Sequence, residues 1–397
     1  MKKPKIRFNG FNDDWEQRKL GDITESYSGG TPTAGKKEYY DGNIPFIRSG
    51  EISSDKTELF ISEEGLNRSS AKMVKIGDIL YALYGATSGE VSISKLKGAI
   101  NQAILAIQPH QNYDSQFLMQ WLRKSKENII GTYLQGGQGN LSGNIVKELI
   151  IDIPTYEEQK EIGAYLKKLD HLITLHQRKC DEIKKLKKYM LQNMFPQDEE
   201  KVPKIRFYGF TDDWEQRKFV EFVKNAAKKN KDNIDLEPYA VTNDRGFIAQ
   251  KDAHDDFGYM SNVDRTAYNI VPPNSFAYNP ARINVGSLGY YEGTENVIVS
   301  SLYEVFQTEE YIDDKFLLHW FKSDSFPRWI EKLQEGSVRL YFYFDKLVQC
   351  QMMVPSLEEQ KRISAYLDSI DQLITLHQRK CDELKNMKKF MLQNMFV

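Results

Sequence analysis

Cysteine is scarce in this sequence, and its spacing excludes two kinds of site. The chain has three cysteines in 397 residues, at Cys180, Cys350 and Cys381. Cysteines so far apart provide neither a disulfide framework nor the close pairs that bind structural zinc. We therefore expect no metal site and a chain that works in a reducing compartment, the cytoplasm.

Long hydrophobic runs are also missing. No apolar stretch follows the first residues, Met1-Lys2-Lys3-Pro4, and no segment approaches the roughly 20 apolar residues that span a membrane. We therefore expect no membrane partner. A hydrophobic content of 40% with charges of both signs is typical of globular domains with real cores.

Motifs for catalysis are absent as well. The sequence contains neither of the glycine-rich loops that hold nucleotide phosphates, and its six histidines have no metal-ligand spacing. The run Asn279-Pro280-Ala281-Arg282 lacks the second proline and the aromatic residue of the amino-methyltransferase motif. We therefore expect no enzyme activity and no cofactor on this chain.

The overall charge gives no simple sign of nucleic-acid binding. It is −2 at pH 7, which counts against a protein that coats DNA with a basic surface. Any hypothesis of DNA binding has to account for this charge.

The sequence does contain a long internal repeat. The segment Leu172–Glu182, LITLHQRKCDE, returns unchanged as Leu373–Glu383. Upstream, two residues separate Pro154 and Pro355 from a Glu-Glu-Gln-Lys run, and both copies end in Leu-Gln-Asn-Met-Phe. A repeat of this length divides the chain into two halves of similar build.

Each copy of the repeat is predicted to be one long helix. Apolar residues recur three or four positions apart, glutamates lie in the first turns and lysines in the later turns, as the helix dipole favours. At 1.5 Å per residue the first helix would be about 58 Å long, and its apolar stripe needs a partner along its length. The other copy is the natural partner, and the predicted pairing residues are Ile162, Leu166, Leu169, Ile173, Ile183, Ile363, Leu367, Ile370, Ile374 and Leu384.

A short stub and a variable block precede each helix. The stub around Trp15 recurs around Trp214, and we predict that both tryptophans are packed anchors. The blocks, residues 20–153 and 219–354, are predicted to consist of short strands and turns with one or two helices. Expected strands include Ile79–Tyr84 and Gly98–Ile107 in the first block, and Ser275–Tyr278 and Val297–Phe306 in the second.

These features give four predicted segments. They are the first stub and recognition block (1–153), the first long spacer helix (154–196), the linker, second stub and second recognition block (197–354), and the second spacer helix (355–397).

The two halves share their stubs and helices but few residues of their blocks. Identical surfaces suit identical partners, whereas divergent surfaces suit different ligands. DNA is the polymer most often read at two separated short sites, so a two-part DNA target fits this division. The second block holds more Asp and Glu than Lys and Arg, so partners would supply most phosphate contacts.

A family resemblance follows from the order of several motifs. These are Ser28–Pro32 (SGGTP), Ile44–Ile47 (IPFI), Gly77–Leu80 (GDIL), and Leu149–Thr155 (LIIDIPT) leading into Glu157–Lys160 (EEQK). With the duplicated helix, they make the whole chain resemble the specificity subunit of type I restriction-modification systems.

The resemblance implies a fold and a set of partners. The fold is α+β, with two similar mixed α/β target recognition domains separated by two long helices in an antiparallel coiled coil, related by a pseudo-two-fold repeat. The implied partners are double-stranded DNA, two methyltransferase subunits and two motor-nuclease subunits. S-adenosylmethionine, ATP and magnesium are expected on those partners. The second block has Asn225–Lys229 where Gly-Gly-Thr-Pro would stand, so contacts from that loop are expected in the first block only.

Candidate base contacts are polar, planar side chains beside turns. Arginine pairs with guanine, and asparagine or glutamine with adenine, in the major groove. The candidates in the first block are Arg48, Tyr84, Thr87, Ser88, Gln102, Gln138 and Asn140. Those in the second block are Arg245, Tyr278, Arg282, Asn284, Arg339 and Tyr341.

The duplicated helices alone also fit a second function, a tandem coiled-coil adaptor whose blocks bind protein or glycan. An aromatic content of 12% is compatible with such blocks. Co-purification with a methyltransferase, followed by a DNA-binding assay, separates the two functions.

Overall fold

The chain forms two compact units in the computed structural model, which describes residues 3–134, 140–197, 200–243, 246–253, 264–333 and 341–397. The first unit comprises residues 1–177 with 378–397, and the second comprises residues 178–377. Each unit therefore contains one variable block and a part of both long helices. The predicted α+β fold with an internal repeat is confirmed.

The two long helices are α6 (Tyr156–Asn193) and α11 (Leu357–Asn394). In the first unit, Lys388 Nζ donates to Asp170 Oδ1 at 2.5 Å. In the second unit, Lys187 Nζ donates to both carboxylate oxygens of Asp371 at 2.5 Å. Gln177 also contacts Cys381 in the first unit, and Cys180 contacts Ile374 in the second. Within each unit, residue numbers therefore rise along one helix as they fall along the other, so the helix segments of each unit pair antiparallel.

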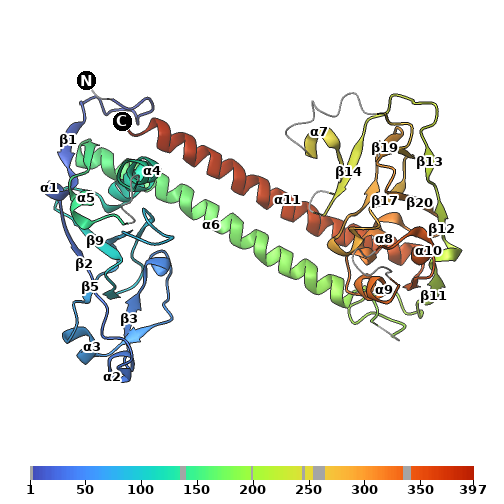
Figure 1. Cartoon of the computed structure of the whole chain (residues 1–397), viewed down its shortest axis with the longest axis horizontal. Helices are drawn as coiled ribbons and strands as arrows, with labels where there is room; N and C mark the ends of the chain where they lie inside the picture. Colours follow the sequence, from blue (N-terminus) through green and yellow to red (C-terminus); the bar gives the residue numbers. More distant parts are fainter. Residues whose placement is uncertain (1–2, 135–139, 198–199, 244–245, 254–263, 334–340) are drawn as a thin grey trace. The chain divides into compact units, whose positions relative to one another are not determined.

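The first unit holds two four-stranded sheets and a two-stranded one (Figure 1). One sheet has the order β2-β9-β6-β7, from Thr24–Ser28, Ile104–Pro109, Ile79–Ala82 and Val91–Ile93. The other has the order β4-β3-β8-β5, from Phe60–Ile61, Ile44–Ile47, Gly98–Ile100 and Lys72–Val74. The stub strand β1 (Glu16–Lys19) pairs with β10 (Ile150–Ile153). The helices of this block are α1 (Leu20–Ile23), α2 (Lys37–Tyr40), η1 (Ser49–Glu51), α3 (Glu63–Asn67), α4 (Ser115–Tyr133) and α5 (Gly143–Lys147).

The second unit repeats the first sheet of the first unit. The order β12-β20-β17-β18 is built from Val223–Asn225, Glu304–Thr308, Ser275–Tyr278 and Leu288–Tyr291. A three-stranded sheet follows, β13-β16-β19, from Lys228–Lys229, Asn269–Val271 and Val297–Val299. Two further strand pairs lie among the described residues of this unit: β14 (Tyr239–Thr242) with β15 (Gly246–Ala249), and β11 (Glu215–Lys218) with β21 (Gln351–Val354). Its helices are η2 (Phe219–Glu221), α7 (Gln250–Ala253), η4 (Ile283–Val285), α8 (Asp314–Phe321), α9 (Ser325–Leu333) and α10 (Phe344–Leu347).

Two predicted strands, Gly98–Ile107 and Val297–Phe306, are each divided in two. Ile104 N–H donates to Asn101 O at 3.2 Å, and Tyr303 N–H donates to Ser300 O at 3.0 Å. These turns carry the chain from one sheet to another. The prediction of single strands was wrong because it continued each strand through a polar pair, Asn101-Gln102 or Ser300-Ser301, which lies in the turn between the two sheets.

Each unit has an aromatic cluster where stub, block and helix end meet. In the first unit, the Phe117 ring lies 5.7 Å from Trp15 and 5.1 Å from Phe396, between ring centroids. In the second unit, Phe316 lies 5.9 Å from Trp214 and 5.3 Å from Phe195. Trp15 is 5% exposed and Trp214 is 2% exposed, so the prediction of packed anchors is confirmed.

The predicted pairing residues lie in these same cores. Ile162, Leu166 and Leu169 are buried in one cluster with Phe117 and Phe396. Five of the remaining members are buried too: Ile183, Ile363, Leu367, Ile370 and Leu384. Ile173 and Ile374 are half-buried. The stripe therefore packs against the blocks as well as along the helices, and the pairing role of each residue stays a prediction.

A buried ion pair joins each stub to the start of a long helix. Arg7 donates to both carboxylate oxygens of Glu158 at 2.7 Å, and Arg206 does the same to Glu359 at 2.7 and 2.8 Å. Both glutamates are almost fully buried. A buried carboxylate without its partner is costly, so the arginines hold the stubs in place.

Replacing Arg206 with Met should lower the free energy of unfolding by about 3–5 kcal/mol, because Glu359 would be left buried without its cation. Urea unfolding followed by tryptophan fluorescence measures this loss. The matched control is Arg217→Met, since Arg217 forms exposed pairs with Glu215 and Glu221 and such pairs contribute about 0–1 kcal/mol. Equal losses in the two variants would contradict a special role for the buried pair.

Helix α8 contacts α11 through a buried histidine. His319 is fully buried, and its Nε2 lies 2.8 Å from Asp368 Oδ1. Burial lowers the pKa of His319, and the hydrogen bond from His319 lowers the pKa of Asp368. Gln120 of α4 occupies the equivalent place in the first unit and donates to Asp170 at 2.7 Å.

Acid should therefore weaken the second unit through His319. Because its pKa in the folded state lies below the ordinary value of about 6.5, its stabilising contribution is complete above that value and is lost as the pH falls below it. The melting temperature should fall from pH 7.5 to pH 5.5 more steeply in the natural chain than in His319→Gln. Identical declines would mean that His319 does not titrate on unfolding.

Candidate nucleic-acid interface

The first block brings two distant segments together at the end of strand β6. Tyr84 forms an isolated antiparallel bridge with Asn140, and Leu141 N–H donates to Leu83 O at 2.9 Å. Asn140 is exposed and Tyr84 is half-buried. We call residues 83–90 and 140–142 the first loop pair.

The remaining candidates of this loop pair lie in the turn after β6. Ser88 Oγ and Ser88 N–H both donate to Gly85 O, at 3.0 and 3.1 Å. Gly85 has a φ of 83°, a left-handed conformation that favours glycine. This turn holds Thr87 and Ser88 beside Tyr84, with both side chains half-exposed.

The second block has an equivalent arrangement at the end of strand β17. Phe342 N–H donates to Pro280 O at 3.1 Å, which joins residues 279–287 to residues 341–343. We call these segments the second loop pair. Arg282 and Asn284 are exposed in this pair. Tyr341 and Tyr343 stack with ring centroids 5.4 Å apart and planes 5° apart.

The two loop pairs occupy the same place in the same kind of sheet. Strands β6 and β17 are both flanked by a hairpin partner and by the strand that precedes the block's main helix. The backbone position is shared, while the side chains are Tyr, Thr, Ser and Asn in one block and Arg, Asn and two Tyr in the other. Such planar and polar groups can bond base edges, and exposed rings can stack.

Tyr343 is a residue of this surface that the sequence reasoning missed. Its side chain is 49% exposed, and it continues the stack begun by Tyr341. The alternation Tyr341-Phe342-Tyr343, with Phe342 fully buried, is the signal that could have revealed it.

Two candidates of the first block lie outside the loop pair and have their own partners. Arg48 donates to Glu51 at 2.9 Å and to Glu58 at 2.8 Å. The hydrogen bond from Arg48 lowers the pKa of Glu51 to about 2, so this pair stays charged. Gln102 is exposed in the turn before β9 and accepts a hydrogen bond from Thr31 Oγ1. Their base contacts stay predictions.

The structure places Tyr278 in the core. Its side chain is fully buried in β17, as is that of Tyr81 at the equivalent place in β6. A base contact by Tyr278 would require the sheet to open. Three further candidates, Gln138, Arg245 and Arg339, lie outside the described residues.

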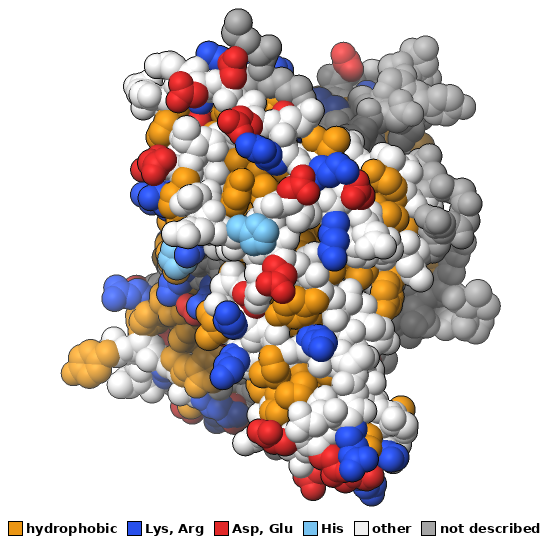
Figure 2. Space-filling view, turned by 90° about the vertical axis from the view of Figure 1, so that its left-hand side faces the viewer, with side chains coloured by type: hydrophobic (Ala, Val, Ile, Leu, Met, Phe, Trp, Pro, Cys, Tyr) orange, Lys and Arg blue, Asp and Glu red, His pale blue; other side chains and the backbone are white. Residues whose placement is uncertain are grey.

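No continuous basic surface covers the face shown in Figure 2, as far as its residues are described. Lys and Arg side chains alternate there with Asp and Glu. On that face, recognition would depend on individual side chains, in keeping with the small net charge.

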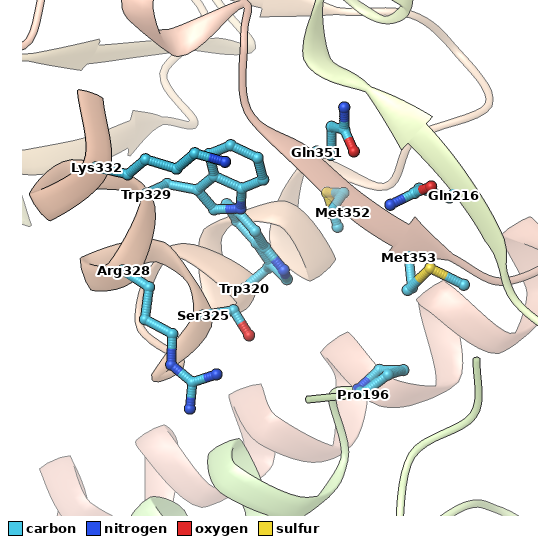
Figure 3. A pocket seen from close by; sticks show the side chains of 10 residues that line it. All are labelled: Pro196, Gln216, Trp320, Ser325, Arg328, Trp329, Lys332, Gln351, Met352 and Met353. Carbon is cyan, nitrogen blue, oxygen red and sulfur yellow. The ribbon is translucent and has the colours of Figure 1, made fainter. Parts of the chain in front are cut away.

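The second unit also contains a pocket that the sequence did not predict (Figure 3). Its volume is about 210 Å³, and Trp329, Arg328 and Lys332 of α9 face Gln351 and the methionines of β21 across it. The lining residues include no carboxylate, histidine or cysteine. The pocket offers binding groups, among them the guanidinium of Arg328 and the indole of Trp329.

One group of side chains in the second unit has the composition of a metal site. His319, Asp368 and Asp371 each place a ligand atom within 4.8 Å of the others. Lys315 pairs with Asp368 at 3.3 Å, and Lys187 pairs with Asp371 at 2.5 Å. These lysines already neutralise the carboxylates, so the group is an ion-pair network.

No helix in the described part of the chain is long and apolar enough to cross a membrane.

Comparisons with known proteins connect this geometry to a family. The model of the type I restriction modification DNA specificity domain matches twice, at residues 12–185 and 211–386. The MjaVIII specificity subunit of Methanocaldococcus jannaschii is 22% identical over 397 residues, covering 95% of this chain and 91% of that protein.

Two further relatives agree. The EcoR124I/EcoR124II specificity subunit of Escherichia coli is 28% identical over 167 residues, covering 40% of this chain and 41% of that protein. The crystal structure of the restriction-modification S subunit from M. genitalium has the same fold, with a TM-score of 0.66 at 15% identity and coverage of 100% of this chain and 99% of that one. The resemblance drawn from the sequence is thereby confirmed: the chain belongs to the type I restriction-modification DNA specificity family, whose domain it carries twice.

Proposed function

We propose that this chain is the subunit that reads DNA sequence in a type I restriction-modification complex, with one half of a bipartite target bound by each block. The observation that carries the proposal is the pair of equivalent loop pairs, which share a backbone position and differ in side chains. A repeated scaffold that presents different side chains suits a DNA target made of two half-sites with different sequences.

The partners in this proposal are methyltransferase subunits, two per chain. In the first unit the long helices expose Leu175, Met387 and Phe390, and in the second unit they expose the equivalent residues Leu376, Leu186 and Tyr189. Phe390 and Tyr189 are each more than half exposed. Exposed large apolar side chains repeated in this way suit a protein partner that binds twice.

The chemistry of the complex is assigned to other subunits. Methylation with S-adenosylmethionine belongs to the methyltransferase subunits, and cleavage with ATP and magnesium belongs to two motor-nuclease subunits. This chain positions them on DNA without catalysing a step itself. A cytoplasmic location is part of the same proposal.

The proposal is tested through Arg282, which is exposed in the second loop pair. Arg282→Ala should weaken binding of the target by about 1–3 kcal/mol and relax one position of one half-site, because the alanine cannot form the bidentate hydrogen bonds of arginine to a base. The measurement is methylation mapping and DNA affinity of the complex assembled with its methyltransferase.

The matched control is Arg217→Ala, which removes the same charge from β11 in the same unit. The other half-site should be unaffected in both variants. Unchanged base preference in Arg282→Ala would remove this residue from the reading surface. A complex of the natural chain with no sequence preference would refute the proposed function itself.

A further inference from the structure

Four basic side chains surround one hollow in the second unit. Lys184, Lys187 and Lys188 of α6 and Lys322, which follows α8, line a hollow of about 350 Å³ together with Leu191, Asp324 and Ile374. Lys184, Lys188 and Lys322 are exposed. The hollow is therefore open to a ligand from solvent.

The charges of this hollow are not balanced. Lys187 is paired with Asp371, and Asp324 accepts a hydrogen bond from Gln192 at 2.9 Å. In the described part of the chain, no carboxylate lies within salt-bridge distance of Lys184, Lys188 or Lys322. An anion entering the hollow would meet three ammonium groups that lack a bonded counter-charge.

The first unit has the same basic groups. The residues equivalent to Lys184, Lys187, Lys188 and Lys322 are Lys385, Lys388, Lys389 and Arg123. Lys388 Nζ and Arg123 Nη1 share one carboxylate, that of Asp170, at 2.5 and 2.9 Å. Two cations on one anion leave an excess of positive charge, to which the exposed Lys389 adds, while Lys385 is exposed and pairs with Asp382 at 4.0 Å. We call the two sets of four the basic patches.

The repetition of the patches indicates what they bind. A surface that reads sequence has to differ between the halves, because their half-sites differ. The sugar-phosphate backbone is alike at both half-sites, and lysine suits it because an ammonium group contacts phosphate with little geometric demand.

A protein partner is the other ligand that would be alike in both halves, and the helix surface disfavours it here. Leu186 lies two residues from Lys184 and from Lys188, which places it on the opposite side of α6. The exposed apolar residues thus form a separate surface from the basic patch. Lysine is also depleted in protein–protein interfaces relative to the rest of the surface.

We infer that the two basic patches are phosphate-binding sites, which hold the DNA backbone of each half-site independently of its sequence. The inference rests on the proposed function. It also accounts for DNA binding by a chain of net charge −2, since the positive charge is gathered where the backbone is held.

The test replaces the exposed lysines of both patches with glutamine: Lys184→Gln, Lys188→Gln, Lys385→Gln and Lys389→Gln in one chain. Lys187 and Lys388 are left intact because they pair with carboxylates of the opposing helix. The matched control removes four charges elsewhere on the same helices: Arg178→Gln, Lys179→Gln, Arg379→Gln and Lys380→Gln.

The complex assembled with methyltransferase is titrated with its target duplex and with a duplex of scrambled half-sites, over a series of salt concentrations. For the patch variant, the slope of the logarithm of the binding constant against the logarithm of the salt concentration should be shallower. The difference should be about 0.9 for each phosphate that the variant no longer neutralises. Affinity should fall by the same factor on both duplexes, and the methylated sequence should not change. The control should keep the slope of the natural complex.

A slope equal to that of the control would overturn the inference, as would a loss of affinity confined to the target duplex. Failure of the patch variant to assemble with methyltransferase would assign the lysines to protein docking and overturn it as well. If the natural complex binds the two duplexes equally well, the proposed function is refuted. The salt dependence of binding to the scrambled duplex still tests whether the patches bind phosphate.

Discussion

The stability of each unit depends on the aromatic side chains that complete its core. In the first unit, Phe396 at the end of α11 packs on Phe117 and Trp15, and in the second unit Phe195 at the end of α6 packs on Phe316 and Trp214. Truncating a buried phenylalanine typically costs about 3–5 kcal/mol. Each helix begins in one unit and ends in the core of the other, so neither core is complete without both helices.

Because each core needs both helices, the residues that build the cores are constrained, whereas other residues can differ between the two halves. The stubs, helix starts and helix ends make the aromatic cluster and the buried Arg–Glu pairs, and they are nearly identical in the two halves. The polar side chains of the loop pairs have no such structural role, because they lie at the edge of the sheet. The apolar members of the same segments, Leu83, Leu141, Ile283 and Phe342, belong to the cores. Divergence within the blocks leaves the stubs and the long helices intact, which suits a protein whose binding specificity differs between two halves.

Much of this fold could be predicted from the sequence, because its largest elements are marked by local patterns. The repeat and its 3.6-residue periodicity located both long helices, and the repeated stub located the two buried tryptophans. The sheet changes at Asn101 and Ser300 were missed although the polar pairs Asn101-Gln102 and Ser300-Ser301 mark them, because the predicted strand continued through each pair. The loop pairs depend on contacts between distant residues, such as Tyr84 with Asn140, which periodicity does not report. In the sequence, the lysines late in α6 were explained by the helix dipole. Only the structure shows that Lys184, Lys187 and Lys188 line a hollow together with Lys322.

The central claim is that each variable block determines the half-site sequence, or word, that its half binds, and that the stubs and long helices can carry either block. It is tested most directly by replacing residues 219–354 with a second copy of residues 20–153 and mapping the bases methylated by the assembled complex. Because the two halves are joined through antiparallel helices, the account predicts a target in which the first word occurs twice, as an inverted repeat. A complex that still methylates the original second word would contradict the account, because the word would then be determined outside the block.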